Sequence, residues 1–206
     1  SMSISLSGSN VFQSGATTAE YAVSAEGDGA IGLNGYDNGT PEGDFRKSIV
    51  DALLAVDQQH ILRREYSGRL SAAIEAQQVF TAALSAAPPI ASPFSAGPFS
   101  QSLRQIARII AAREELQATR QTFFITVGGW DHHDDVLDNQ AAMLPGIADG
   151  LLEFRNALVE IGMLQQVTTF TISEFGRTLT SLGKGSDHGW GGHHIVMGGG
   201  VQGGQY

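Results

Sequence analysis

The hydrophobic positions divide the chain into three stretches with different periods. Residues 1–42 are rich in Ser, Gly, Asn and Thr and contain short alternating segments such as SISLSG and EYAVSA, which predict strands or extended arms joined by turns. From 43 to 120 the apolar residues recur at helical spacing, and 121–206 opens with an apolar, β-branched run. We therefore expect one domain with an extended arm, a mainly helical segment and a strand–helix–strand segment, in that order.

The helical segment has apolar side chains at intervals of three and four residues. They are Ile49, Leu53, Val56, Leu62, Tyr66, Leu70 and Ile74. This spacing predicts two helices, or one long bent helix with Gly68 as the interruption. A proline-rich loop over 86–100 follows, and 103–117 then predicts a helix with one apolar face.

The last segment predicts a βαβ unit. The run QTFFITVGGW (121–130) is typical of a buried strand, 138–161 of a helix, and QVTTFTIS (166–173) of a second strand. A strand–helix–strand order favours a mostly parallel sheet with helices packed on it, which is an α/β fold. Ligands bind beyond the carboxyl ends of the strands in such sheets.

Two polar clusters follow the two predicted strands. GGWDHHDD (128–135) and GSDHGWGGHH (185–194) together hold five of the six histidines. Since both clusters follow the carboxyl ends of strands in one predicted sheet, we expect them to meet at the same edge.

The clusters contain the side chains that a divalent cation needs. Asp131 and His133 are two residues apart, so in an extended segment they face the same side. Asp187 and His188 are adjacent, and glycines on both sides permit the turned backbone that lets both converge on one ion. His132, between the likelier pair, stays open between a ligand and a structural residue.

Two further histidines, one arginine and two tryptophans accompany the clusters. Of His193 and His194, at most one is expected to point at a given metal. Arg177, in SEFGRT just after the second strand, can clamp an oxyanion or can pair with Glu174 and shape the loop. Both roles stay open, and Trp130 and Trp190 are expected to pack under the site.

Composition limits the kind of site and partner. The chain has no cysteine, so any metal must be held by histidine and carboxylate. The formal net charge of −9 argues against nucleic acid or an anionic membrane surface as the main partner. No apolar run approaches the roughly 20 residues of a membrane span.

Three segments resemble a known family. LRQIARIIAAREEL, RQTFFITVGGWDHHDDVLDNQ and VTTFTISEFGRTLTSLGKGSDHGWGGHHIVMGGGVQGG are similar to the C-terminal part of the bacterial domain-of-unknown-function 1501 family, which is sulfatase-like and belongs to the alkaline phosphatase superfamily. The resemblance implies an alkaline-phosphatase-like α/β/α sandwich around a mostly parallel sheet. It also implies that the chain is the C-terminal portion of a longer, exported or periplasmic protein, so that the fold is incomplete here.

The resemblance also implies a metal site and a reaction. Asp131 with His133, and Asp187 with His188, match the superfamily's metal-binding motifs, with His193 or His194 completing one site. The metal implied is Zn or Mn, with Ca as an alternative, and the reaction is hydrolysis of a phosphate or sulfate ester of a small molecule or polymer, with Arg177 as a catalytic anion clamp. The nucleophile is expected from the N-terminal half.

One alternative comes from a different class of protein. A non-catalytic, exported binding module can keep the same fold and use the histidine and aspartate clusters only to shape its loops. A nucleophile at a strand end in the longer protein favours the enzyme, and its absence favours the binding module. The oligomeric state is left open by the sequence.

Overall fold

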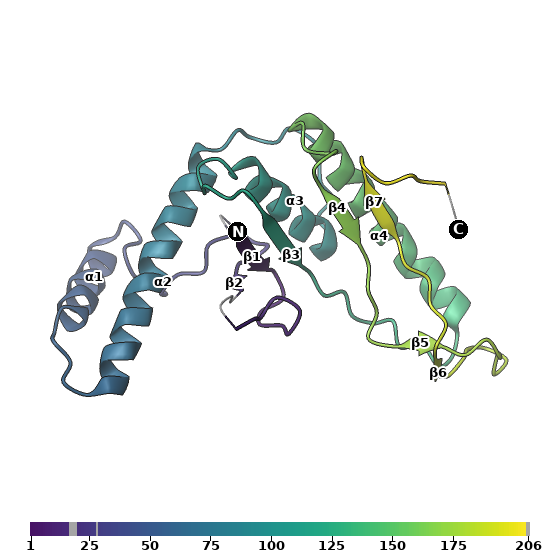
Figure 1. Ribbon diagram of the computed structural model, residues 1–206, viewed down its shortest axis with the longest axis horizontal. Coiled ribbons are helices and arrows are strands. Elements are labelled where there is room, and N and C mark those ends of the chain that lie inside the picture. Colours follow the sequence, from purple (N-terminus) through teal and green to yellow (C-terminus); the bar gives the residue numbers. More distant parts are fainter. Residues whose placement is uncertain (17–19, 28, 205–206) are drawn as a thin grey trace. The chain divides into compact units, whose positions relative to one another are not determined.

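The computed structural model describes residues 1–16, 20–27 and 29–204 (Figure 1). It is a mixed α/β structure that divides into two compact units. The first comprises residues 1–87 and 112–122, and the second comprises residues 88–111 and 123–206. Every candidate site residue named from the sequence lies in the second unit.

A small parallel sheet lies mostly in the first unit, and only residues 123–124, at the end of its last strand along the chain, belong to the second. Strands β1 (Met2–Ser5), β2 (Tyr21–Ala22) and β3 (Gln121–Phe124) are arranged in the order β2-β1-β3. Ile4 pairs with Tyr21 and is completely buried, and the ring of Tyr21 packs on that of Phe80 with centroids 5.2 Å apart. The stretch expected to form an extended arm thus provides two short strands and part of a core.

Two helices complete this unit. Helix α1 (Pro41–Leu54) starts at Thr40, whose hydroxyl oxygen accepts a hydrogen bond from the Gly43 amide at 3.1 Å. Helix α2 (Ile61–Ala86) starts at His60, whose Nδ1 accepts from the Leu62 amide at 3.2 Å. These caps satisfy amides that have no partner inside the helix.

The expected interruption at Gly68 is therefore wrong. The two helices are separated at 55–60, and Gly68 lies inside α2. A glycine in a helix interior costs only about 1 kcal/mol relative to alanine, which a helix of 26 residues tolerates. The break is placed by the cap at His60 instead.

The second unit is built on a packed pair of helices, α3 (Pro98–Ala111) and α4 (Val136–Glu160). Their contact is close at Gly150, where an added Cβ would lie 2.8 Å from the Phe99 ring. The buried apolar residues of the two helices form the core of this unit. They are Leu103, Ile106, Ala107, Ile109, Ile110, Ala111, Leu151, Phe154, Ala157 and Leu158.

Glutamates of α4 also bind the proline-rich loop. Glu160 accepts hydrogen bonds from the amides of Ala91 and Ser92 at 2.6 and 2.8 Å. Glu153 accepts from the Ser95 amide at 3.1 Å and from the Ser100 hydroxyl. Residues 87–97 therefore follow α4 without regular structure of their own, whereas 98–100, expected as the end of the loop, form the first turn of α3.

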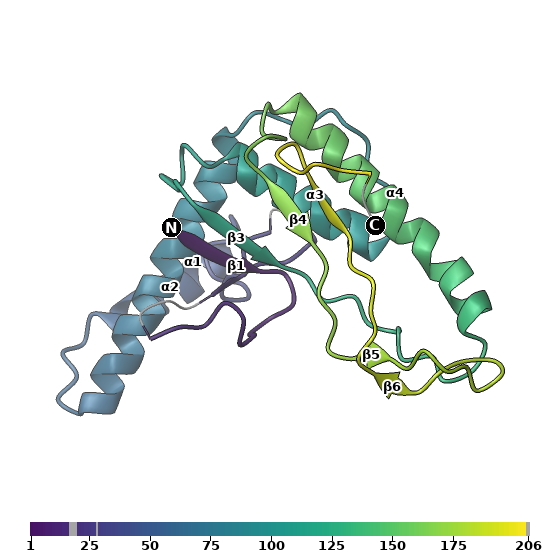
Figure 2. The ribbon, with the colours of Figure 1, turned by 45° about the vertical axis from the view of Figure 1, so that its right-hand side comes forward.

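Two antiparallel strand pairs complete the second unit. Strand β4 (Thr168–Phe170) pairs with β7 (Val196–Gly198), and β5 (Gly176–Arg177) pairs with β6 (His188–Gly189). Figure 2 shows the chain leaving β4 toward β5 and returning from β6 to β7 alongside itself. The β5–β6 pair lies at the end of this arm, near the first turn of α4 (Figures 1 and 2).

The predicted βαβ crossover is wrong in the part of the chain that the structure describes. β3 belongs to the three-stranded sheet, whereas β4 pairs only with β7, and in the antiparallel sense. The two observed strands are also shorter than the apolar runs from which they were predicted.

Over residues 1–16, 20–27 and 29–204, every helix is too short or too polar to cross a membrane.

Candidate metal centre

The site is built on the β5–β6 pair. Arg177 is paired with His188, and the Arg177 backbone also exchanges hydrogen bonds with Gly191 at 2.6 and 3.0 Å. At Gly176 an added Cβ would lie 2.6 Å from the Gly189 carbonyl oxygen, and at Gly189 it would lie 2.7 Å from the Thr178 nitrogen. The strands approach this closely because neither glycine has a side chain.

The segment before α4 is joined to this pair through the loop after β5. The Val136 amide donates to the Lys184 carbonyl at 3.0 Å, and the Lys184 ammonium pairs with Asp135 at 3.2 Å. A Cβ on Gly185 would overlap the carbonyl of His133. Backbone contacts thus bring the two histidine clusters together.

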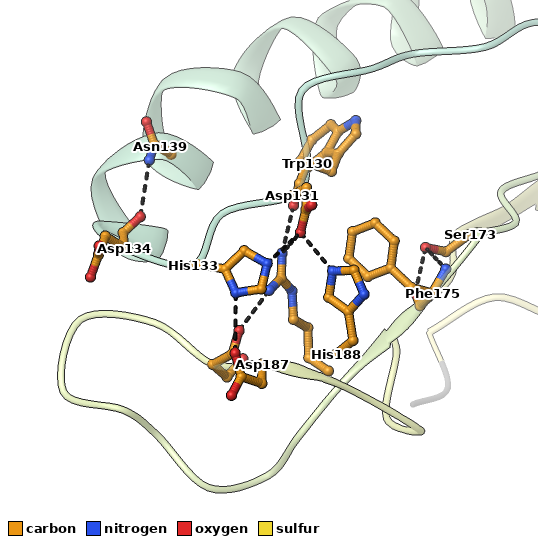
Figure 3. Close-up of polar contacts among 11 residues, drawn as sticks. Trp130, Asp131, His133, Asp134, Asn139, Ser173, Phe175, Asp187 and His188 are labelled. Carbon is orange, nitrogen blue, oxygen red and sulfur yellow. Dashed lines mark hydrogen bonds and ion pairs between the residues drawn. The ribbon is translucent and has the colours of Figure 1, made fainter.

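Three side chains from the two clusters converge on one point (Figure 3). One oxygen of Asp131, Oδ1, lies 2.7 Å from Nε2 of His188 and 3.0 Å from Nε2 of His133. The three candidate ligand atoms all lie within 4.8 Å of one another. The expected meeting of the clusters is confirmed, although it comes from the β5–β6 pair and not from the predicted parallel sheet.

Asp187 joins the group through His133. Its Oδ1 lies 3.2 Å from Nδ1 of His133, on the opposite side of the ring from Asp131. A carboxylate on the second nitrogen of a metal-binding histidine fixes its orientation and tautomer. The geometry therefore suits Asp187 for orienting His133, while direct ligation by Asp187 stays a prediction.

Aromatic rings hold the plane of His188. The Phe175 ring stacks on it with centroids 4.2 Å apart and planes inclined by 8°, and the His133 ring lies 5.2 Å away at 26°. Figure 3 shows Phe175 beside His188. No motif in the sequence indicates Phe175, since only the pairing of β5 with β6 places the residue before Gly176 against His188.

The site favours an ionised carboxylate. The hydrogen bond from His188 holds the pKa of the Asp131 carboxyl below its ordinary value of 3.8, against the opposing effect of partial desolvation, and nearby His188, His133 and Arg177 charges lower it further. Metal ligands bind in their deprotonated forms. Asp131 is accordingly ready to bind a cation at neutral pH.

Arg177 contacts three parts of the site. Nη1 donates to the Ser186 carbonyl at 2.6 Å, and Nη2 donates to the Trp130 carbonyl at 3.0 Å and to Asp131 Oδ1 at 3.2 Å. The alternative prediction, an ion pair between Arg177 and Glu174, is wrong, because the carboxylate that pairs with Arg177 is that of Asp131. The oxyanion clamp stays a prediction.

Other residues singled out in the sequence lie outside the convergent group. His193 and His194 are exposed, and their ligation stays a prediction. Nε2 of His132 is buried without a hydrogen-bond partner, beside the Trp130 ring at 6.5 Å. Trp190 is 83% exposed, so the expectation that it packs under the site is wrong.

The donor set fits a divalent transition metal. One carboxylate oxygen and two imidazole nitrogens are the ligands of many zinc sites, and three protein ligands leave a coordination position for water or substrate. Ca²⁺ prefers six to eight oxygen ligands. Asp131, His133 and His188 therefore suit Zn²⁺ or Mn²⁺ better than Ca²⁺.

Comparison with known proteins gives one family. The model of a family described as "Protein of unknown function (DUF1501)" matches residues 18–206. No curated protein and no solved structure matches the chain.

Proposed function

The chain belongs to the DUF1501 family, and from this premise and the convergence of Asp131, His133 and His188 we propose that it is a metal-dependent hydrolase of phosphate or sulfate esters. The convergence carries the proposal, because two imidazoles and a carboxylate from separate loops meet at one exposed point. An exported location and an alkaline-phosphatase-like fold belong to the same proposal. The fold is supported by the match of Asp131 with His133, and of Asp187 with His188, to that superfamily's motifs, and the exported location by the resemblance of the chain to this family.

Each side chain has a defined task in this proposal. Asp131, His133 and His188 hold the ion, Asp187 orients His133, and Phe175 keeps the His188 ring in plane. The ion, when bound, polarises the ester oxygen and stabilises the negative charge of the transition state. The attacking group comes from outside this set, which contains no serine, threonine or cysteine.

Metal content is the direct test. Tag-free protein is incubated with Zn²⁺ or Mn²⁺, dialysed and analysed by elemental mass spectrometry. We expect near-stoichiometric metal in the wild type and its loss in His188→Ala, because that variant removes one of three ligands. His60→Ala is the matched control, since His60 caps α2 in the other unit, and it should retain the metal.

Turnover is measured on the metal-loaded protein. Aryl phosphate and aryl sulfate esters distinguish the two substrate classes through the same coloured product. No metal in the wild type after incubation with excess Zn²⁺ and Mn²⁺ would refute the proposal for this chain. Metal without turnover on either ester would leave the site a metal-binding site and exclude hydrolysis of these aryl esters.

A binding module is the second candidate, and the exposure of Trp190 favours it. This ring is 83% exposed immediately after β6, where it can stack on the ring of a sugar or another flat, apolar surface. Tryptophan fluorescence during titration with a sulfated polysaccharide tests this reading. A saturable change that is lost in Trp190→Ala, with no ester turnover, would favour the binding module.

A further inference from the structure

We infer that Arg177 is a positioning residue, which holds the Asp131 loop and the Ser186 loop together and so sets the geometry on which the three candidate ligands converge. The part of this inference that concerns metal affinity rests on the proposed function. The part that concerns the two loops rests on the contacts of Arg177 alone.

The contacts of Arg177 join segments that are far apart in the sequence. Its guanidinium donates to the carbonyl of Trp130 and the carboxylate of Asp131 on one side, 47 and 46 residues away, and to the carbonyl of Ser186 on the other. Trp130 and Ser186 directly precede the candidate residues Asp131 and Asp187. One side chain thus fixes the backbone at the start of both clusters.

The guanidinium is itself held in place. Its carbon lies 4.9 Å from the centroid of the Phe175 ring, and Phe175 stacks on His188. The Arg177 side chain is only 23% exposed, whereas that of Asp131 is 56% exposed. The backbone of Arg177 is fixed by its pairing with His188 and Gly191. A rigid donor on a rigid strand can orient the more exposed carboxylate.

These contacts conflict with an anion clamp. Arginine grips a carboxylate, phosphate or sulfate best through two parallel N–H groups of its planar fork. Both terminal nitrogens of Arg177 already donate to protein oxygens. An ester anion gripped by both nitrogens would have to displace a contact that holds one of the loops.

The first measurement needs no metal. Amide hydrogen exchange is compared between the wild type and Arg177→Ala over 129–135 and 184–190. We expect faster exchange in both segments and unchanged exchange in α3 and α4, because only the two loops lose a contact. Arg155→Ala, an exposed arginine on α4, is the control for removing a positive charge and should leave both segments at wild-type rates.

The second measurement is metal affinity by calorimetry with Zn²⁺. We expect Arg177→Ala to weaken binding by about 10- to 100-fold, the usual loss when a residue that orients metal ligands is removed. Arg177→Lys should recover part of this loss, because lysine keeps the charge but cannot donate to three oxygens in the same fork. The visible spectrum of bound Co²⁺ should change in Arg177→Ala, which reports ligand geometry independently of stability.

The outcomes separate this inference from the proposed function. Wild-type exchange in both segments of Arg177→Ala would overturn it. Full recovery of metal affinity in Arg177→Lys would also overturn it, because the role of Arg177 would then be its charge alone. Unchanged metal affinity in Arg177→Ala, together with weaker inhibition of ester turnover by inorganic phosphate, would overturn it too and would make Arg177 an anion clamp. A wild type that binds no metal would defeat the proposed function, and hydrogen exchange alone would then decide the role of Arg177.

Discussion

Helices α1 and α3 have the same length and the same first residue, yet they differ in what they bury. Each has 14 residues and begins with proline. Nine residues of α3 are buried, whereas α1 buries only Gly43. Along α1, Phe45, Ile49 and Leu53 follow one another at intervals of four but are 67%, 43% and 62% exposed.

The difference shows that an apolar stripe predicts a helix but does not predict whether another element packs on that stripe. Residues four apart share one face of any helix, and both helices have such a face. In α3 the stripe packs in the helix pair with α4. In α1 it remains exposed within the unit to which α1 belongs, so propensity and capping, more than burial, keep this helix formed.

The largest effect should come from the same substitution made in both helices. Ile109→Ala removes a completely buried side chain of α3 and should lower the free energy of unfolding by about 2–5 kcal/mol. Ile49→Ala, at 43% exposure, should change it by no more than about 0.5 kcal/mol. Urea denaturation of both variants measures the pair, and equal losses would show that α1 is also covered in solution.

A smaller effect should follow from removing the cap of α1. Thr40→Ala leaves the Gly43 amide without its hydrogen bond of 3.1 Å and should cost about 1 kcal/mol. Hydrogen exchange in α1 should rise, since little burial supports the helix. Ser48→Ala inside α1 is the control and should not raise exchange. Unchanged exchange in Thr40→Ala would mean that the cap does not limit the stability of α1.

The smallest effect should be a dependence on pH at the end of α4. Hydrogen bonds from Ser92 and Ala91 hold the pKa of Glu160 below its ordinary value of 4.5. The stabilisation is therefore complete above that value and is lost as the pH falls through the lower, folded pKa. Glu160→Gln should be less stable than the wild type at pH 7, and the difference should be smaller at pH 3.

Urea denaturation at the two pH values measures this difference. The control is Glu75→Gln, which removes the charge of an exposed glutamate on α2. A difference between Glu160→Gln and the wild type that stays constant from pH 7 to pH 3 would contradict the assignment. The proline-rich loop would then be held by its other contacts.

Much of the secondary structure could be predicted from the sequence, and the pairing of the strands could not. Intervals of three and four residues indicated the helical segments, because these intervals are a property of the helix itself. The break between the two helices was predicted at Gly68 and lies at 55–60, because a cap such as that of His60 leaves no periodic pattern of apolar residues. The antiparallel pairing of β4 with β7 depends on partners distant in sequence, which local patterns do not contain.

The sequence indicated which residues belong to the site better than it indicated what each residue does there. Residue type and the two clusters indicated Asp131, His133, Asp187 and His188, and these four side chains are in contact. The roles of Phe175 and Arg177 follow from stacking and from hydrogen bonds to carbonyls. Such contacts depend on the path of the backbone and have no sequence signature.

The close backbone approach at Gly176, Gly185 and Gly189 has a consequence for how this site tolerates change. None of the three has a positive φ, so each is required for space and not for its conformation. In saturation mutagenesis scored by metal retention, all three positions should reject even alanine, while exposed Leu179 and Leu182 should accept most residues. Substitutions in the centre are thus limited by the lack of space at these three glycines as much as by the need to keep the candidate ligands.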